Sequence, residues 1–238
     1  MRLPRLYAPL EVQLLKVQFA QSDAWQAQTR AQSPTALFDA VANWLAQEVK
    51  ARHVQLHAWS LTPEGLLMLA TPPDAGALSA VVQAVGRRLG ATLSSGGVFA
   101  GRYKSALVES DRVLAAQIWV ERAPQINGCV ANPVDWAWSS AGLHTGIVTT
   151  TRPWVMPLTD HPSYWNCGNT PFARQAAYQD KLAAGLLNKE RQEIEAAVAG
   201  QWALGSDKYL SKISKFASRR VKPGKRGRPA KISATPTP

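Results

Sequence analysis

The 238-residue sequence has few cysteines, few acidic residues and no long apolar run. Its two cysteines, Cys129 and Cys167, lack the paired spacing of a zinc ribbon and are too few for a disulfide scaffold, so both are expected to be reduced. No stretch reaches the about 18 consecutive apolar residues of a membrane span, and the amino end lacks the unbroken apolar core of a secretory signal. We therefore expect a cytoplasmic protein with no membrane partner.

Acidic side chains are outnumbered by basic ones, 16 Asp and Glu against 27 Lys and Arg, which gives a formal net charge of +11. The excess is uneven, because ten Lys and Arg and one Asp follow from Ser206 onward. That stretch has a net charge of +9, which leaves +2 for residues 1–205. Concentrated cations bind polyanions by releasing counterions, so nucleic acid is the expected partner. The alternative is a solvated tail that only confers solubility.

Hydrophobic patterning predicts a packed body with the element order βαββαβ. Strands are expected at 12–19, 54–61, 66–71 and 98–108, with helices at 35–50, 78–89 and 111–122. Ser33 and Pro34 have the residue types of a helix N-cap and first turn. The strict alternation in the second strand assigns Leu56, Ala58 and Ser60 to one face. This order indicates the α+β class and a ferredoxin-like fold, with two helices on one sheet face and the other face open for binding.

After Pro133 the composition changes, and a Thr-, Gly- and Pro-rich passage follows. Helical patterns return at about 172–187, 189–199 and 207–219, the last with Ser206 as its N-cap. We therefore divide the chain into a DNA-binding sheet domain at 1–140, a linker at 141–170, a small helical region at 171–220 and a basic disordered tail at 221–238.

Several short motifs occur in an order that resembles the REP-associated tyrosine transposases, which belong to the HUH single-tyrosine transposase superfamily. They are Arg2-Leu3-Pro4-Arg5-Leu6-Tyr7, Leu56-His57-Ala58-Trp59, Gly86-Arg87-Arg88, Phe99-Ala100-Gly101-Arg102-Tyr103-Lys104-Ser105, Asp135-Trp136-Ala137-Trp138-Ser139-Ser140 and Gly227-Arg228-Pro229. The resemblance covers nearly the whole chain. It implies a ferredoxin-like domain that binds hairpin-forming DNA and cuts one strand during DNA transposition and recombination.

The resemblance also implies a catalytic apparatus, which this sequence lacks. The family holds a divalent metal such as Mg²⁺ with two histidines one residue apart on a strand, and a helix tyrosine attacks the phosphate. The matching positions here are Gly65, Leu67 and Trp119. Neither Gly65 nor Leu67 offers a side-chain ligand, and an indole cannot form a phosphoester. Because the chemistry needs both the ion and the nucleophile, we expect a catalytically defective protein without a cofactor.

Replacement of the lost groups by other residues is the competing interpretation. His53, His57 and Glu64 lie near the missing metal site in sequence, and Tyr103 is a second tyrosine close to the sheet. A single histidine on a strand is more often structural than a ligand, and Tyr103 lies between cations, where stacking on a base or packing on the sheet is its expected role.

Residues suited to DNA binding are better preserved than those for cleavage. Arg87 and Arg88 end a helix, while Arg102 and Lys104 flank Tyr103 and are expected to place cations beside an aromatic platform. The segment 225–231 resembles an AT-hook, whose Arg-Gly-Arg-Pro core lies in the minor groove of A·T-rich duplex. The expected DNA-binding residues are Arg87, Arg88, Arg102, Tyr103, Lys104, Arg219, Arg220, Lys225, Arg226 and Arg228.

Three functions remain open from the sequence. The favoured one is a DNA-binding, catalytically defective transposase relative whose partner is hairpin-forming single strands or A·T-rich duplex. The second is an active transposase or nuclease with relocated metal ligands. The third is a single-stranded RNA-binding or protein-interaction module, because ferredoxin-like sheets also bind RNA by stacking. A decaying gene without a selected product is a further alternative.

Overall fold

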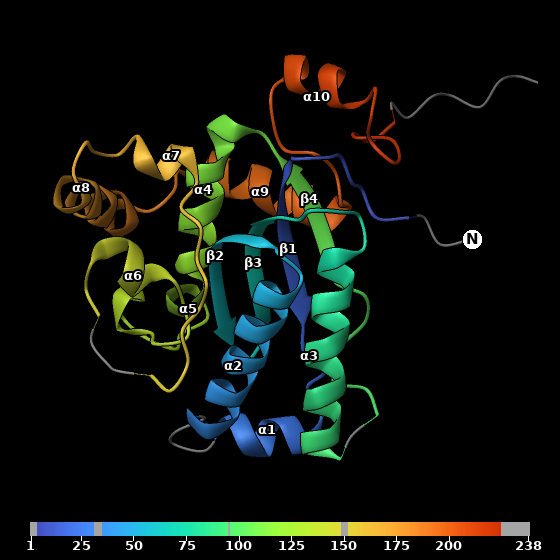
Figure 1. Cartoon of the computed structure of the whole chain (residues 1–238), viewed down its shortest axis with the longest axis vertical. Helices are drawn as coiled ribbons and strands as arrows, with labels where there is room; N and C mark the ends of the chain where they lie inside the picture. The colour runs from blue at the N-terminus through green and yellow to red at the C-terminus, as the bar shows by residue number, and fades with distance from the viewer. Residues whose placement is uncertain (1–3, 31–34, 95, 149–151, 225–238) are drawn as a thin grey trace, which may run out of the picture.

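A four-stranded antiparallel sheet forms the centre of the molecule, in the strand order β2-β3-β1-β4 (Figure 1). The computed structural model describes residues 4–30, 35–94, 96–148 and 152–224. The sheet is built from β1 (Val12–Gln18), β2 (Gln55–Thr62), β3 (Gly65–Thr71) and β4 (Lys104–Val108). This order and the antiparallel pairing confirm the α+β class and the ferredoxin-like arrangement.

The helices are distributed over both faces of this sheet. In chain order they are α1 (Asp23–Arg30), α2 (Thr35–Ala51), α3 (Ala77–Leu93), α4 (Ser110–Glu121), α5 (Ala123–Ile126), the 3-10 turn η1 (Pro133–Asp135), α6 (Ala141–Thr145), α7 (Pro162–Trp165), α8 (Pro171–Ala184), α9 (Asn188–Gly200) and α10 (Asp207–Ile213). The predicted caps Ser33 and Pro34 lie outside the described residues. The predicted N-cap Ser206 is confirmed, since its Oγ accepts from the Tyr209 N–H at 3.2 Å.

The first sheet face is covered by α2 and α3, as the pattern predicted. Their apolar residues, including Phe38, Leu45, Val81 and Val85, pack on the side chains of β1, β2 and β3 that point to this face. Burial of apolar side chains against one sheet face stabilises both helices. For this reason the apolar residues of each helix recur at helical spacing.

The second sheet face is not open, so the expectation of a free binding surface there is wrong. Val113, Ala116 and Val120 of α4 and Val198 of α9 pack against Leu69 and the neighbouring apolar side chains of that face. The faces of β1 and β3 are apolar on both sides, and a sheet with two apolar faces must be covered twice.

Two strands depart from the sequence pattern. The pairing of β2 with β3 shifts between Leu56 and Ala58, so His57 lies in a β-bulge. Beyond the bulge the facing is reversed: Leu56 packs toward α2 and α3, whereas the Ser60 Oγ donates to the Val120 carbonyl on the α4 side at 2.7 Å. The assignment of Leu56, Ala58 and Ser60 to one face was therefore wrong.

The fourth strand is shorter than the predicted range 98–108. Only Lys104–Val108 pairs continuously with β1. The preceding residues touch the sheet through one isolated bridge, Phe19 with Phe99. Gly101, at φ +147°, interrupts the extended backbone between the two.

Two parts of the chain between η1 and α7 lie against the β2 edge, through the bridges of Ser139 with Ser60 and of Leu158 with Leu56, and tryptophans bind this part of the chain to β2 and α2. The Trp136 indole N–H donates to the Leu61 carbonyl at 2.7 Å. The indoles of Trp138 and Trp154 both donate to Asp39 of α2, at 2.8 and 2.9 Å. Trp154 belongs to the segment 141–170 expected to be a linker, which is also bound to β2, because the Thr159 N–H donates to the Leu56 carbonyl at 2.8 Å.

Glu121, the last residue of α4, is fully buried and joins α4 to α6 and α8. Its carboxylate accepts from Ser140 and pairs with His144 at 2.5 Å, and it accepts from the Tyr178 hydroxyl at 2.7 Å. Burial raises the pKa of Tyr178 well above its ordinary value, and the adjacent Glu121 charge raises it further. A buried carboxylate is tolerated only with such partners.

The carboxyl-terminal residues fold back onto the amino-terminal segment. Tyr209 and Ile213 of α10 pack with Leu6 and Leu107. The Ser218 N–H donates to the Tyr7 carbonyl, and its hydroxyl donates to the Arg5 carbonyl at 2.8 Å. No helix among the described residues has the length and apolar character needed to cross a membrane.

Candidate functional site

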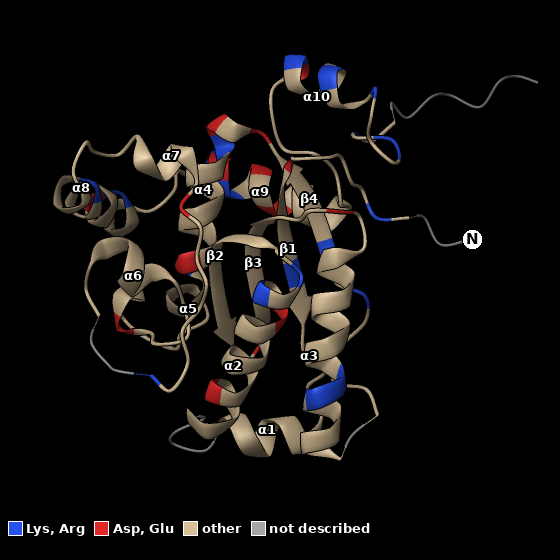
Figure 2. Ribbon diagram, in the orientation of Figure 1, with Lys and Arg blue, Asp and Glu red and all other residues tan. Residues whose placement is uncertain are grey.

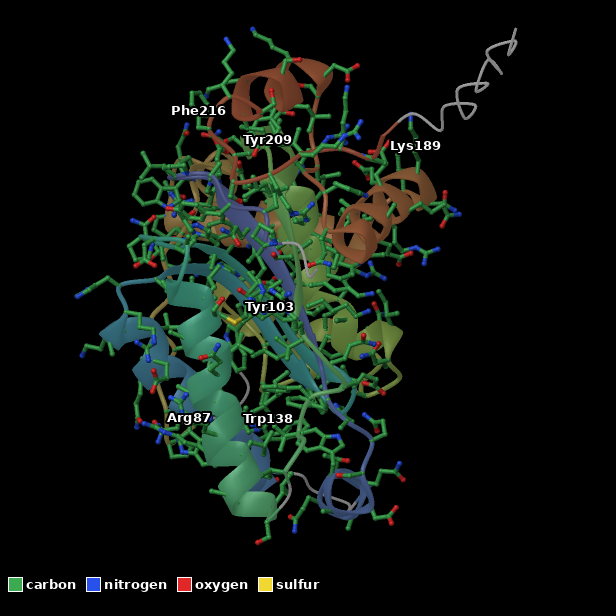
Figure 3. The ribbon with its side chains drawn as sticks, turned by 90° about the vertical axis from the view of Figure 1, so that its right-hand side faces the viewer. Arg87, Tyr103, Trp138, Lys189, Tyr209 and Phe216 are labelled. Atoms are coloured by element: carbon green, nitrogen blue, oxygen red, sulfur yellow. The ribbon has the colours of Figure 1, made fainter. Side chains whose placement is uncertain are left out.

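Three of the short motifs, far apart in the sequence, meet in one groove beside α3. The groove has a volume of about 710 Å³, and its lining includes Arg5, Arg87 and Arg102. Figure 3 looks onto this side of the molecule, with Arg87 of α3 and Tyr103 labelled. No Asp or Glu of the described chain lines the groove. We name it the motif groove; its charge suits an anionic ligand.

Arg5 and Tyr103 form the wall of the motif groove next to β4. The Arg5 guanidinium lies over the Tyr103 ring, 3.6 Å from its centroid, and donates to Ser79 at 3.2 Å. The Tyr103 hydroxyl is 2.9 Å from the same Ser79 Oγ. Burial lowers the pKa of Arg5 from its ordinary value, and the nearby Arg102 lowers it further. An anion between these cations relieves that repulsion.

Glycines give the motif groove its shape. A Cβ on Gly86 would come within 2.5 Å of the Phe99 ring, so only glycine lets the 98–103 segment lie this close to α3. Gly101 has a φ that other residues rarely adopt. The glycines of the two motifs are therefore needed for the fold of the groove, independently of any ligand.

The predicted binding residues do not form one patch. Arg87 and Arg102 line the motif groove, but Arg88 turns toward α2, where it donates to Gln47 at 2.7 Å and pairs with Glu48 at 3.5 Å. Tyr103 is buried and capped by Arg5, so its ring is not the open stacking platform that the sequence suggested.

Lys104 lies apart from Arg102, in a hollow on the other side of the sheet with Lys16 and Trp119. The expected pairing of Arg102 and Lys104 around an aromatic platform is therefore wrong. The backbone around Gly101 is not a strand, so the two-residue repeat that would put both cations on one face does not hold there.

The carboxyl-terminal cations differ in exposure. Arg219 is held against the end of α9 by a hydrogen bond to the Gln201 carbonyl and lies over the Trp202 ring at 5.2 Å. Burial lowers its pKa from the ordinary value. Arg220 is exposed. Figure 2 shows cations on α10 and the segment after it. The predicted DNA contacts Lys225, Arg226 and Arg228 lie outside the described residues.

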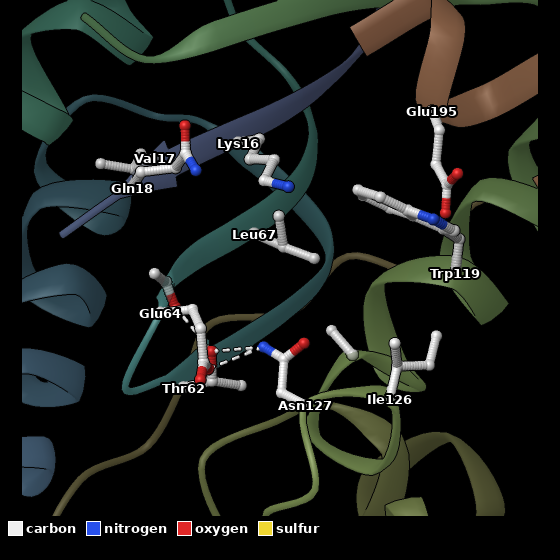
Figure 4. A pocket seen from close by; sticks show the side chains of 12 residues that line it. Lys16, Val17, Gln18, Thr62, Glu64, Leu67, Trp119, Ile126, Asn127 and Glu195 are labelled. Carbon is white, nitrogen blue, oxygen red and sulfur yellow. Dashed lines mark hydrogen bonds between the residues drawn. The ribbon is translucent and has the colours of Figure 1, made fainter. Parts of the chain in front are cut away.

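Gly65, Leu67 and Trp119 line one pocket of about 280 Å³ between β3, α4 and α5 (Figure 4). Their proximity, expected from the sequence, is confirmed. Lys16, Glu64 and Glu195 contribute the charges of this pocket, and Asn127 donates to Glu64 at 2.8 Å and to Thr62 at 3.1 Å. We name it the Trp119 pocket.

A divalent metal does not fit the residues at these positions. A Cβ built on Gly65 would overlap the carbonyl oxygen of Val17 on the neighbouring strand, so β1 leaves no room for any side chain there. Leu67 is apolar and packs with Leu69 and Trp119. Among the described residues, no group of three or more His, Cys, Asp or Glu is arranged to hold a metal ion.

Of the alternative ligands considered from the sequence, Glu64 lines the Trp119 pocket, whereas His53 and His57 do not. His53 is exposed at the end of α2, with a φ of 51°. His57 is buried, with its ring nitrogens 2.7 Å from the Thr159 carbonyl and 2.9 Å from the Thr71 hydroxyl. Tyr103 lies in the motif groove, and burial raises its pKa, which disfavours a tyrosinate nucleophile.

Sequence reasoning did not select Lys16, Glu195 or Asn127, and it quoted Arg5 only as part of a motif. Lys16 is the one charged residue of β1, a signal that could have found it. Glu195 and Asn127 reach the pocket from elements whose packing the sequence does not specify.

Comparisons with known proteins support the fold alone. No protein-family model and no curated protein matches the chain. A solved structure of a REP-associated tyrosine transposase bound to a REP hairpin is similar, with a TM-score of 0.51 and 15% sequence identity. The similarity covers 67% of this chain and 94% of that chain.

Proposed function

We propose that this chain is a transposase-like DNA-binding protein that holds hairpin-forming DNA in the motif groove without cutting it. The observation that supports this most is the convergence of Arg5, Arg87 and Arg102, from three separate motifs, on a groove free of carboxylates among its described lining. The structural neighbour, at low identity, is bound to a DNA hairpin. Guanidinium groups in a concave surface suit phosphodiester oxygens, which they contact in bidentate fashion.

The proposal that cutting is lost rests on the Trp119 pocket. Metal-assisted transfer to a tyrosine needs a Lewis acid beside the phosphate and an in-line phenolate. Gly65 and Leu67 supply no ligand, and Trp119 supplies no nucleophile. The close approach of β1 to Gly65 leaves no room for a ligand side chain at this position.

The residues of the tail are proposed to add a second contact with DNA. Lys225, Arg226 and Arg228 follow the described chain directly, and their Arg-Gly-Arg-Pro sequence suits the narrow minor groove of A·T-rich duplex. Val221, the first residue of the tail, packs with Leu6, which is one residue from Arg5. Tail and groove are therefore able to reach neighbouring parts of one DNA molecule.

The test is an anisotropy titration of the full chain with a labelled DNA hairpin, its RNA counterpart and a duplex, each in Mg²⁺, Mn²⁺ or EDTA. We expect DNA binding that is independent of metal, with no nicked strand and no covalent protein–DNA adduct on a denaturing gel. Absence of DNA binding, or tighter binding of the RNA hairpin, contradicts the proposal. Metal-dependent nicking or an adduct shows instead an active nuclease with relocated ligands.

A further inference from the structure

A hollow beside α6 takes no part in the proposed function (Figure 1). Its volume is about 400 Å³, which lies within the usual range for sites that bind small molecules. Its walls are mainly apolar and include Trp136, Trp154 and Met156, and the exposed side chains of Leu143 and Val155 also line it. We name it the α6 pocket. Apolar and aromatic walls with few polar groups are typical of a ligand site.

The two tryptophans of the α6 pocket are held in place by the rest of the fold. The Trp136 indole N–H donates to the Leu61 carbonyl of β2, and the Trp154 indole N–H donates to Asp39 of α2. Trp154 also packs edge-on against Trp59, with ring centroids 5.4 Å apart. Because both indole donors are used inside the protein, the pocket offers a ligand aromatic rings. A pocket formed in advance loses little conformational entropy on binding.

Arg152 is the one charged side chain among the described residues that line the α6 pocket. Its guanidinium lies over the Trp138 ring, 4.5 Å from the ring centroid, and this contact orients it. The Arg152 Nε is buried and has no hydrogen-bond partner within the described chain. A buried donor without a partner is costly, so the guanidinium is suited to an acceptor brought by a ligand.

Asp39 does not satisfy this arginine. Its Oδ1 is 3.6 Å from the Arg152 Nη1, which is too long for a hydrogen bond. The same Oδ1 accepts from the indoles of Trp138 and Trp154 at 2.8 and 2.9 Å. Because two other donors share this oxygen, Arg152 keeps the capacity to bind a second anion. A carboxylate fits best, since its two oxygens match two parallel N–H groups of a guanidinium.

We propose that the α6 pocket binds a small aromatic carboxylate, with its ring against Trp136 and Trp154 and its carboxylate paired with Arg152. Indole and thioether walls favour an aromatic body. One cation in an apolar pocket favours a single negative charge over a phosphate monoester, whose second charge would be buried without a partner. The site is separate from DNA binding, because none of its described lining residues lines the motif groove.

The test is isothermal titration calorimetry of the full chain with benzoate, cinnamate and naphthoate, whose aromatic bodies differ in size. We expect at least one of them to bind at one saturable site per chain. The carboxamide of each body and acetate are expected to bind at least about tenfold more weakly, because each lacks the charged hydrogen bond or the aromatic contacts. The absence of saturable binding for all three carboxylates at millimolar concentration overturns the proposal, as does equal affinity for carboxylate and carboxamide.

Arg152→Gln locates the binding site. It is expected to weaken binding of the carboxylate at least about tenfold and to leave the carboxamide unchanged, because it removes the charge and keeps a polar side chain. Arg112→Gln is the matched control and should change neither, since Arg112 is a partly exposed arginine of α4 that also has a 3.6 Å ion pair, with Glu193.

If Arg152→Gln does not fold, Arg152→Lys replaces it. Lysine keeps the charge without the planar fork, so an affinity between those of the parent and the carboxamide is expected. Carboxylate binding that is unchanged by the Arg152 variants contradicts the proposal. Binding that is lost instead in Arg87→Ala/Arg102→Ala would place the anion in the motif groove and contradicts it equally.

Discussion

Gly65 is the single residue that excludes a metal site in the Trp119 pocket most clearly. It begins β3 and pairs with Gln18 of β1, and a Cβ there would overlap the Val17 carbonyl oxygen. The sequence identified it as a position without a ligand, but the backbone approach that excludes every side chain was visible only in the structure. For that reason, restoring histidine at this position is not expected to restore a metal site.

Gly65→Ala is expected to destabilise the protein by about 1–3 kcal/mol, the usual range for overpacking a well-packed site. Urea denaturation measures the change in the free energy of unfolding. Gly97→Ala is the matched control, because a Cβ there meets nothing within 4 Å, and it should stay within about 0.5 kcal/mol of the parent. If Gly65→Ala and the parent chain had equal free energies of unfolding, the backbone of β1 would have moved away from the added methyl group at little cost. The position would then be open to side chains.

Most helices and strands were predictable from the period of the hydrophobic residues and from the turn residues. The departures from regular structure within them were not. The helices over 35–51 and 77–93 follow a clear 3.6-residue period. The bulge at His57, the late start of β4 and the packing of α9 on the second sheet face depend on contacts between distant segments, which no local pattern encodes. The Glu121 cluster likewise joins α4, α6 and α8, which are distant in the sequence.

The β2 bulge gives the fold a pH dependence. Burial lowers the pKa of His57 from 6.5 to about 4, and the Thr159 carbonyl only partly offsets this. His57 also faces His161, whose ring centroid is 5.2 Å away and whose own pKa is lowered by burial, and it senses His144 and Asp160. His57 is therefore neutral in the folded state and takes up a proton more readily when unfolded.

The stability due to neutral His57 is complete above pH 6.5 and is lost as the pH falls from 6.5 toward 4, by about 3 kcal/mol in total. Urea denaturation across this range should show a steeper loss for the parent than for His57→Gln, which cannot titrate. Parallel curves would mean that His57 is as easily protonated in the folded chain as in the unfolded one.

On the scale of the whole molecule, most of the excess positive charge lies outside the Trp119 pocket, whose lining includes one lysine and two glutamates. The sequence placed most of the excess charge after Ser206, and Figure 2 shows cations on α10 and on α3. What the sequence did not specify is which cations share a surface: Arg87 and Arg102 lie in the motif groove, whereas Arg88 and Lys104 lie elsewhere. Side-chain direction at a helix end and in an irregular segment depends on tertiary contacts.

The most direct test of DNA binding in the motif groove is the salt dependence of affinity for hairpin DNA. Each phosphate contact adds about 0.9 to the slope of log K against log salt concentration. The slope is expected to fall by about two for Arg87→Ala/Arg102→Ala, because two phosphate contacts are removed. Lys181→Ala/Lys189→Ala removes the same charge from α8 and α9, outside the groove, and should leave the slope unchanged. Equal slopes for the parent and the Arg87→Ala/Arg102→Ala variant would contradict the account.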